Sequence, residues 1–333
     1  MENFVLPPSC TLTKRDEPFV LFDGKTDKNS RIIMFSTDRN IQLLRHYCNW
    51  INDGTFFVAP RIFKQSYTFH SYVMGKCIPL VFVLMADKTG DSYEFMLRKL
   101  RDVLPTPIDN GTVLIDFEKA AMNAYLKIFP GLFLLMCFFH ICQSLQKRIS
   151  ASFKKAYSAD KEFAKSARLV VFLAFVPEEK VEEAFYEVSY HVAATYPRLM
   201  GILNYFEEYY LGKLVPESED RIPPRFPVSF WNHYVTVCAD PEFPRTSNMV
   251  EGFHRGFRTR IHRARPSVTE YFRAVREQQV ITDFHVDRLE VGICPSKRRK
   301  TTHHELYEIV SKYETYESNL AYLFDIAKHF GHE

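Results

Sequence analysis

Residues 50–85 read WINDGTFFVAPRIFKQSYTFHSYVMGKCIPLVFVLM, and three strand-like runs lie within them, at 50–58, 66–73 and 77–85. The gaps between the runs are short, and Gly75 with Lys76 is a plausible hairpin turn, so the pattern predicts an antiparallel meander. The third run is apolar throughout, as expected for a strand buried on both faces. Asp53 interrupts the first run, where an unpaired carboxylate would be costly. Either the chain turns at Asp53, or its carboxylate is needed for function.

After the meander, helical and strand patterns alternate. A helical repeat in YEFMLRKLRDVL ends before Pro105 and is followed by a short apolar strand at 111–116. A helical segment from Phe117 and a strand within 132–138 come next. This alternation predicts an α/β fold, with a mixed sheet that contains parallel crossovers and is flanked by helices.

Composition divides the chain into five expected segments. Helix-forming residues with many Tyr and Phe dominate the region before the Arg-rich stretch, which predicts an all-helical insertion into the α/β core. The segments are an N-terminal arm (1–45), the first part of the core (46–154), the helical insertion (155–235), the completion of the core (236–290) and a basic link with a C-terminal helix (291–333).

The bulk properties favour a globular intracellular protein. The chain has 333 residues and is 46% hydrophobic, which is enough for a sizeable core. Its seven cysteines are odd in number and scattered, so we expect a reducing compartment rather than a disulfide framework. The first residues show no basic stretch followed by an apolar core, and we expect neither a signal peptide nor a membrane span. A short basic run, KRRK at 297–300, is either a nuclear localisation signal or a solvated link.

Positive charge is concentrated in one segment although the net charge is only +3. Between Arg245 and Arg276 the chain carries eight Arg, no Lys and two acids, Glu251 and Glu270. Such a segment is typical of a surface that binds an anionic polymer, and the alternative is a solvated helix face. The residues that we predict to contact such a polymer, DNA if the family resemblance given below holds, are Arg245, Asn248, Arg255, Arg258, Arg260, Arg263 and Arg265.

Two aspartates are expected at one edge of the sheet. Asp53 lies in the first strand of the meander, and Asp116 ends the crossover strand that can lie parallel beside it. Adjacent carboxylates repel each other unless a cation lies between them, and Mg²⁺ binds one or two carboxylates while it keeps sites for water and phosphate oxygens. Two ions held by three carboxylates stabilise both the attacking and the leaving oxygen in phosphodiester displacement.

Glu251 is the third carboxylate that we propose, near the start of the Arg-rich helix. From this position it joins the acidic site to the basic surface. Arg255 and Arg258, one and two turns further along, would then face the phosphate backbone whose scissile bond lies over the metals.

Each acid also has a structural alternative. Asp53 with Gly54 is a strong hairpin signal. Asp116 can cap a helix that starts at Phe117, and Asn248 with Glu251 has the spacing of a capping pair. Arg245 and Asn248 fit either a phosphate contact or a role in positioning the Glu251 helix. Spacing alone leaves these alternatives open.

Five segments in order resemble the Mutator-like element (MULE) transposases: DGTFFVAP, PLVFVLMADKTGDSYEFMLRKL, LIDFEKAAMNA, CFFHICQSLQKRI and RTSNMVEGFHRGF. The resemblance covers roughly residues 45–265. It implies a ribonuclease H-like fold with a helical insertion before the last acid, and it identifies Asp53, Asp116 and Glu251 as the DDE triad that holds two Mg²⁺ or Mn²⁺ ions.

The CFFH segment places Cys137 and His140 in a C-x2-H spacing, which the resemblance marks as an element of the active domain. Two ligands are half of a structural zinc site, and Cys142 would add a third. No second half with suitable spacing lies nearby, so we favour a reading without zinc, in which Cys137 and His140 are accessory residues.

The resemblance implies a nuclear DNA transposase that hydrolyses phosphodiester bonds at transposon ends and transfers the strand to target DNA. Family members commonly carry an N-terminal zinc module, whereas residues 1–45 contain a single cysteine, Cys10, and no set of Cys and His ligands. A truncated copy, a host-adopted derivative or a separate DNA-recognition partner would each account for this difference. A homo-oligomer is also expected. The alternative functions are a catalytically silent DNA-binding regulator and a ribonuclease H-like nuclease.

Overall fold

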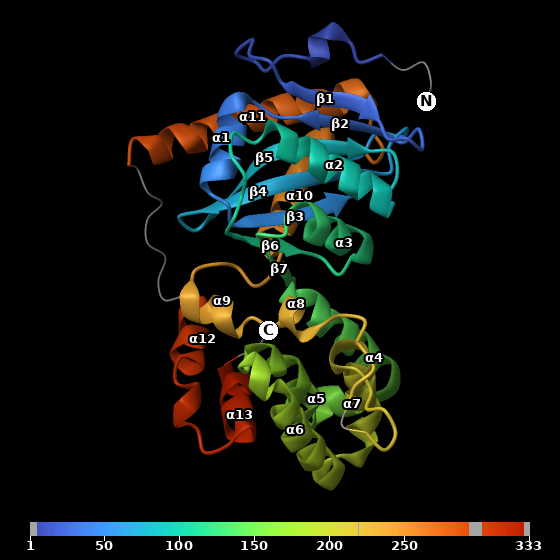
Figure 1. Ribbon diagram of the computed structural model, residues 1–333, viewed down its shortest axis with the longest axis vertical. Helices are drawn as coiled ribbons and strands as arrows, with labels where there is room; N and C mark the ends of the chain where they lie inside the picture. Colours follow the sequence, from blue (N-terminus) through green and yellow to red (C-terminus); the bar gives the residue numbers. More distant parts are fainter. Residues whose placement is uncertain (1–4, 219, 293–301, 330–333) are drawn as a thin grey trace. The chain divides into compact units, whose positions relative to one another are not determined.

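Strands from the whole N-terminal part of the chain form one seven-stranded sheet. The computed structural model describes residues 5–218, 220–292 and 302–329 (Figure 1). It divides into a first unit, Met1–Leu134 with Thr246–Ser296, and a second unit, Leu135–Arg245 with Lys297–Glu333, and each is described by itself. The strands are β1 (Val20–Lys25), β2 (Arg31–Phe35), β3 (Trp50–Thr55), β4 (Gln65–Val73), β5 (Lys76–Met85), β6 (Thr112–Ile115) and β7 (Phe133–Met136).

The strand order is β1-β2-β5-β4-β3-β6-β7. The first five strands in this order pair antiparallel, and β3 then pairs parallel with β6. In the hairpin between β4 and β5, Val73 pairs with Lys76, so the turn residues are Met74 and Gly75, one position earlier than predicted. Both have positive φ, 48° and 79°, which is the backbone that two-residue hairpins of the primed type require.

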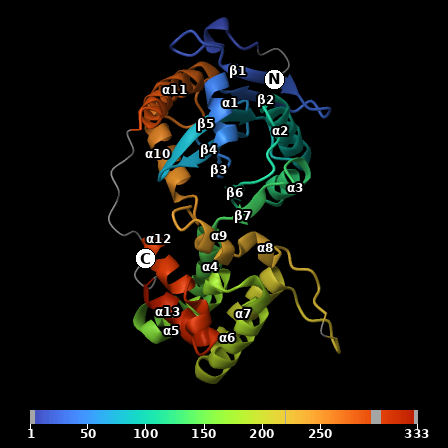
Figure 2. The ribbon, with the colours of Figure 1, turned by 60° about the vertical axis from the view of Figure 1, so that its left-hand side comes forward.

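Helices cover both faces of the sheet, because successive residues of each strand point to opposite faces. On one face, Tyr67 of β4 packs edge-on against Tyr93 of α2 (Gly90–Val103), with 5.7 Å between ring centroids. On the other face, Ser66 Oγ lies 2.8 Å from the Tyr271 hydroxyl of α11 (Val268–Glu290). Figure 2 shows the sheet between α2 with α3 (Lys119–Ile128) and α10 (Asn248–Ile261) with α11. Helix α1 (Asp38–His46) joins the α11 face, where Asn40 donates to Gln279.

The core between the sheet and helices α10 and α11 is aromatic. Phe35 and Phe82 from the sheet meet Phe257 of α10 and Tyr271 and Phe272 of α11, and all five are 2% exposed or less. Burial of five large aromatic side chains fixes α10 against the sheet, because such side chains contribute most of the energy of a close-packed core.

The second unit is helical. It contains α4 (Phe138–Ala159), α5 (Lys161–Phe172), α6 (Val181–Thr195), α7 (Met200–Phe206), α8 (Val228–Trp231), α9 (Tyr234–Ala239), α12 (Thr302–Val310) and α13 (Asn319–His329). Short turns of 3₁₀ or π helix occur in this unit at Leu173–Phe175, Glu178–Lys180, Pro197–Leu199, Glu207–Leu211 and Tyr313–Thr315, and in the first unit at Pro8–Cys10. Trp231 is fully buried, and its indole N–H donates to the carbonyl oxygens of Phe226 and Tyr210.

This arrangement confirms the predicted fold class, a ribonuclease H-like mixed sheet flanked by helices, with helices between the second and third acid. Among the described residues, no helix combines the length and the apolar character needed to cross a membrane.

Two segment boundaries differ from those we expected. The described part of the expected arm, residues 5–45, is not separate from the core, because β1 and β2 extend the sheet of the first unit beyond β5 and α1 belongs to the same unit. The second unit begins at Leu135, within β7, and its first helix, α4, begins at Phe138, whereas we expected the insertion to begin at 155; this part of the unit ends at Arg245 rather than at 235. Residues 138–154, which we assigned to the first part of the core, lie in α4 and belong to the second unit.

The C-terminal region also differs from the single helix that we expected. It forms α12 and α13, and both belong to the second unit. Asn319 at the start of α13 donates to Glu187 of α6 at 2.7 Å, and the Tyr322 hydroxyl donates to the Phe175 carbonyl oxygen. A break between two amphipathic helices allows each to bury its own apolar face. The KRRK run at 297–300 lies outside the described residues.

Gly111, just before β6, lies against the chain segment just before β3. Replacing Gly111 tests whether this close contact requires a residue without a side chain. Its φ is 126°, and a Cβ there would lie 2.5 Å from the Cys48 carbonyl oxygen. Gly111→Ala is therefore expected to lower the free energy of unfolding by about 1–3 kcal/mol, measured by urea denaturation. Gly90→Ala is the control, because no atom lies within 4 Å of a Cβ at that position. Equal stability of the two variants would contradict this prediction.

Candidate active site

Asp53 is a residue of strand β3 and not of a turn. It pairs with Thr68 of β4, and the next residue, Gly54, pairs with Tyr67. Its Oδ1 accepts a hydrogen bond of 2.6 Å from the Gly54 N–H. The hairpin alternative for Asp53 is therefore wrong, and a carboxylate stands within a paired strand.

Asp116 follows strand β6 and lies beside Asp53. In the parallel pair, Trp50 aligns with Val113 and Ile51 with Leu114, and continuing this register by two residues brings Asp53 opposite Asp116. The capping alternative is wrong, because α3 begins at Lys119 and its N-cap is Glu118. The Ser247 hydroxyl, at the start of α10, donates to Asp116 Oδ1 over 3.4 Å.

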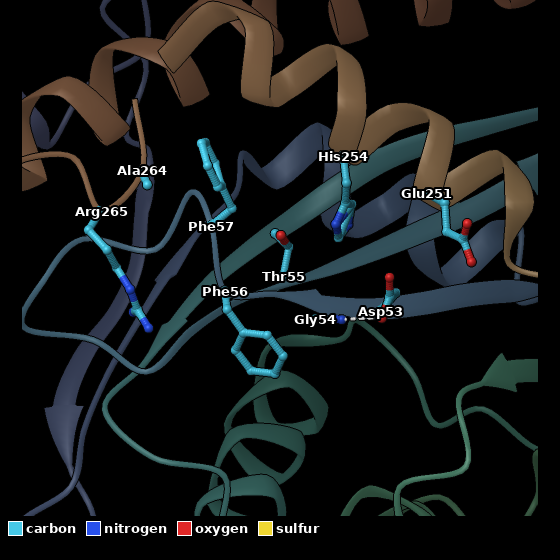
Figure 3. A pocket seen from close by; sticks show the side chains of 9 residues that line it. All are labelled: Asp53, Gly54, Thr55, Phe56, Phe57, Glu251, His254, Ala264 and Arg265. Carbon is cyan, nitrogen blue, oxygen red and sulfur yellow. Dashed lines mark hydrogen bonds between the residues drawn. The ribbon is translucent and has the colours of Figure 1, made fainter. Parts of the chain in front are cut away.

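Glu251 lies in the first turn of α10, on the same face of the sheet as Asp53. The N-cap of this helix is Ser247, and no side chain caps it, so the capping pair of Asn248 with Glu251, the structural alternative for Glu251, does not form. Glu251 and Asp53 line one cavity (Figure 3). The structure thus brings the three acids together from β3, the end of β6 and α10.

The pKa of Asp53 responds both to burial and to the other two carboxyl groups. Burial, the negative charge of Asp116, a side-chain hydrogen bond with Asp116 and the charge of Glu251 together raise the pKa of Asp53 to about 8, against the hydrogen bond from Gly54. A hydrogen bond between two carboxyl groups requires a proton on one of them. The cluster therefore needs either a proton or a cation, and it is a donor set that suits a hard divalent ion.

The cavity beside the acids has a volume of about 570 Å³ and is lined by Asp53, Gly54, Thr55, Phe56, Phe57, Glu251, His254, Ala264 and Arg265. Alternation along an extended chain places Asp53, Thr55 and Phe57 on the α10 face and Phe56 on the other. Figure 3 shows Phe56 and Phe57 pointing to opposite sides, with Glu251 and His254 descending from α10. Acidic groups lie at one end of the cavity and Arg265 lies at the other.

His254 contacts Thr68 of β4, the strand that pairs with the strand of Asp53. Its Nε2 lies 3.2 Å from Thr68 Oγ1, and that hydroxyl also lies 3.3 Å from the Asp53 carbonyl oxygen. Burial lowers the pKa of His254 to about 4, so the imidazole is neutral at physiological pH. It can donate or accept a hydrogen bond in the cavity without changing the charge of the acidic cluster.

The arginines of α10 and the following loop have different surroundings. Arg255 and Arg258 are exposed on α10, and the Arg258 guanidinium lies 3.7 Å from the centroid of the Phe57 ring. The others have intramolecular partners: Arg260 donates to Gln278, Arg263 forms an ion pair with Glu270, and Arg265 donates to the Phe63 carbonyl oxygen. Of the predicted DNA contacts on α10, Arg255 and Arg258 are therefore the most available to phosphate.

Two other predicted DNA contacts lie before or at the start of α10. Asn248 is exposed and is the first residue of the helix. Arg245 is only 6% exposed and belongs to the second unit, where its carbonyl oxygen accepts from the Phe138 N–H. This burial argues against the DNA contact predicted for Arg245 and favours the structural alternative.

Cys137 and His140 belong to the second unit, at the start of α4. The Cys137 carbonyl oxygen accepts from the His140 N–H over 3.1 Å, and Cys137 is fully buried. Burial, with the neighbouring Cys137, raises the pKa of Cys142 to about 12. The accessory role of Cys137 and His140 stays a prediction.

Several residues of the cavity escaped the sequence reasoning. Thr55 and Phe57 follow Asp53 at intervals of two, and this alternation could have placed them on its face. Thr68 and Ser247 carry no such signal, because their contacts with the site depend on strand pairing and on the packing of α10.

Residues 50–144 match the family model of the MULE transposase domain. The chain carries a MULE transposase domain. The matched segment of this domain contains Asp53, Asp116, Cys137 and His140, whereas Glu251 lies beyond it. Comparison with curated proteins gives no match. The resemblance inferred from the sequence is thus confirmed for the family.

The raised pKa of Asp53 predicts a pH-dependent effect of Asp53→Asn on metal-free protein in EDTA. The pKa is higher in the folded protein than its ordinary value of 3.8, so the unfolded chain binds fewer protons and wild-type stability falls between pH 3.8 and about 8. Asparagine has no such proton. The midpoint of thermal unfolding of the variant should therefore exceed that of the wild type by a margin that grows over this range and levels off above it.

Scanning calorimetry at a series of pH values measures the effect. Asp109→Asn, which removes an exposed carboxylate from the same unit, is the matched control. Parallel pH profiles for the wild type and Asp53→Asn would show that Asp53 does not titrate in a crowded carboxylate cluster.

Proposed function

We propose that this protein is the catalytic part of a metal-dependent DNA transposase, with Asp53, Asp116 and Glu251 as its DDE triad. The MULE domain indicates a transposase-related function and therefore DNA as the partner. The observation that carries the catalytic proposal is the convergence of the three carboxyl groups; burial, together with the charges of Asp116 and Glu251, raises the pKa of Asp53. Three acids from distant parts of the chain are costly to bring together unless they hold a cation.

Two Mg²⁺ or Mn²⁺ ions are the cofactors that this donor set fits, since its oxygens are hard ligands and the adjoining cavity leaves room for water and phosphate. When bound, such ions supply the Lewis acidity that lowers the pKa of an attacking water and stabilises charge on the attacking and leaving oxygens.

The residues of the chain then have distinct tasks. The triad positions the reacting phosphodiester. The exposed guanidinium groups of Arg255 and Arg258 bind the phosphates of the flanking DNA backbone. His254 is neutral and contributes hydrogen bonding rather than charge. Water attacks the phosphodiester at an element end, and the freed 3′-hydroxyl then attacks target DNA.

The proposal includes a nuclear location, where DNA is the substrate, and assembly as a homo-oligomer that holds two element ends. It also includes a separate partner that recognises the ends.

Removal of single triad acids is expected to abolish catalysis. Asp53→Asn and Glu251→Gln should each reduce Mg²⁺-dependent nicking of supercoiled plasmid at least about 100-fold, because each removes part of a stabilisation worth several kcal/mol. Joining of a labelled oligonucleotide with a free 3′-hydroxyl to the plasmid should fall in parallel. Glu277→Gln on α11, outside the cavity, is the matched control.

Each of the remaining outcomes would indicate a different function. Activity that survives both substitutions would overturn the triad. Cutting without joining would identify a ribonuclease H-like nuclease, and DNA binding without metal-dependent cutting would identify a silent DNA-binding regulator.

Metal binding has a readout that does not depend on activity. Mg²⁺ or Mn²⁺ should raise the midpoint of thermal unfolding of the wild type, because an ion that binds the folded state stabilises it. The increase should be small or absent in Asp53→Asn and Glu251→Gln and unchanged in Glu277→Gln. An equal increase in all four proteins would place the ion elsewhere.

A further inference from the structure

A second cavity adjoins the one beside the triad. Its volume is about 520 Å³, and it shares Ala264 and Arg265 with the first. Arg61, Arg263 and Arg265 line it, together with residues of the loops on either side. A cavity with acids thus continues into a cavity with arginines within the first unit.

The backbone around the shared residues is held in place from two sides. The Arg265 N–H donates to the Phe57 carbonyl oxygen and its Nη1 to that of Phe63, both over 2.9 Å. Arg265 and His262 both have positive φ, 53° and 60°, which costs energy in residues other than glycine. A loop kept in this conformation presents Arg265 to both cavities in a fixed position.

Phe56 supplies a flat apolar surface at the margin of the first cavity, on the opposite side of the strand from Phe57 (Figure 3). It follows β3 directly, lines the first cavity and is 44% exposed. The Lys88 ammonium lies 4.8 Å from the centroid of its ring and pairs with Glu118 at 2.8 Å. An exposed aromatic ring beside cations is the combination that single-stranded nucleic acid binds, since bases stack on the ring and phosphates pair with the cations.

We propose that the two joined cavities bind an unpaired DNA segment next to the scissile phosphate, with one base stacked on Phe56 and the following phosphates along Arg61 and Arg265. This inference rests on the proposed function and specifies its substrate as DNA with an unpaired strand at the cleavage point. A base inside a duplex is stacked on both sides, so its face reaches Phe56 only after it leaves the stack. Arg263 contributes less, because Glu270 already pairs with it.

The test distinguishes two contributions to DNA binding, stacking of a base and attraction of the backbone phosphates. The probes are a fluorescein-labelled duplex with a single-stranded thymidine tail and the same duplex with a tail of abasic sites, and binding is measured by anisotropy in EDTA. The wild type should bind the thymidine tail at least about fivefold more tightly than the abasic tail, because stacking of one base contributes that much or more.

Phe56→Ala should remove this preference. Phe133→Ala is the matched control and should keep it, because Phe133 is 43% exposed in the same unit and lines neither cavity. Arg61→Gln should weaken binding of both tails by the same factor and reduce the salt dependence of binding by about one phosphate contact. Melting by circular dichroism confirms that the variants are folded.

The failures are distinguishable. If the wild type binds both tails equally, or if Phe56→Ala keeps the preference, this inference falls, whereas the triad is judged separately by metal-dependent cutting. If the wild type binds neither DNA, both this inference and the proposed function fall.

Discussion

The parallel pairing of β3 with β6 is the contact on which the site depends. Its register continues to bring Asp53 opposite Asp116, although 62 residues of chain, including two further strands and a helix, lie between them. Sheet hydrogen bonds thus hold two carboxylates together against their mutual repulsion. The close approach of Gly111 to Cys48 shows how tightly this pair is fitted at its start. Burial, together with the charge of Asp116, raises the pKa of Asp53, and this shift is the electrostatic cost of that position.

Helix α10 completes the site because its two faces have different tasks. Val250, Phe257 and Ile261 are buried, and Phe253 packs against the same aromatic core. Glu251, His254 and Arg258 recur at intervals of three and four on the neighbouring face, toward the cavity and Phe57. The apolar face fixes the position of the helix, so the acid, the imidazole and the guanidinium are held by packing rather than by capping.

The extent to which sequence predicts this molecule varies with the physical origin of each feature. The apolar runs of β3, β4 and β5 and the helical repeat of α2 were predictable, because period and composition are local properties. The positions of β1 and β2 at the edge of the sheet were not, because strand pairing is decided by distant partners. Likewise, the sequence does not distinguish Arg245, which is buried, from Arg255, which is exposed. Their environments depend on which elements pack against them.

By itself the sequence determined the classes of element, the mixed α/β fold, the helical block between the second and third acid and the MULE family of the domain. Each of these depends on the order and spacing of residues along the chain. Only the tertiary structure decided between a turn and a strand residue for Asp53, between a helix cap and a strand-end acid for Asp116, and between a capping pair and a cavity residue for Glu251. It also joined the triad cavity to the cavity lined by arginines. These outcomes depend on the register of β3 with β6 and on the aromatic packing of α10, which are interactions between residues far apart in the chain.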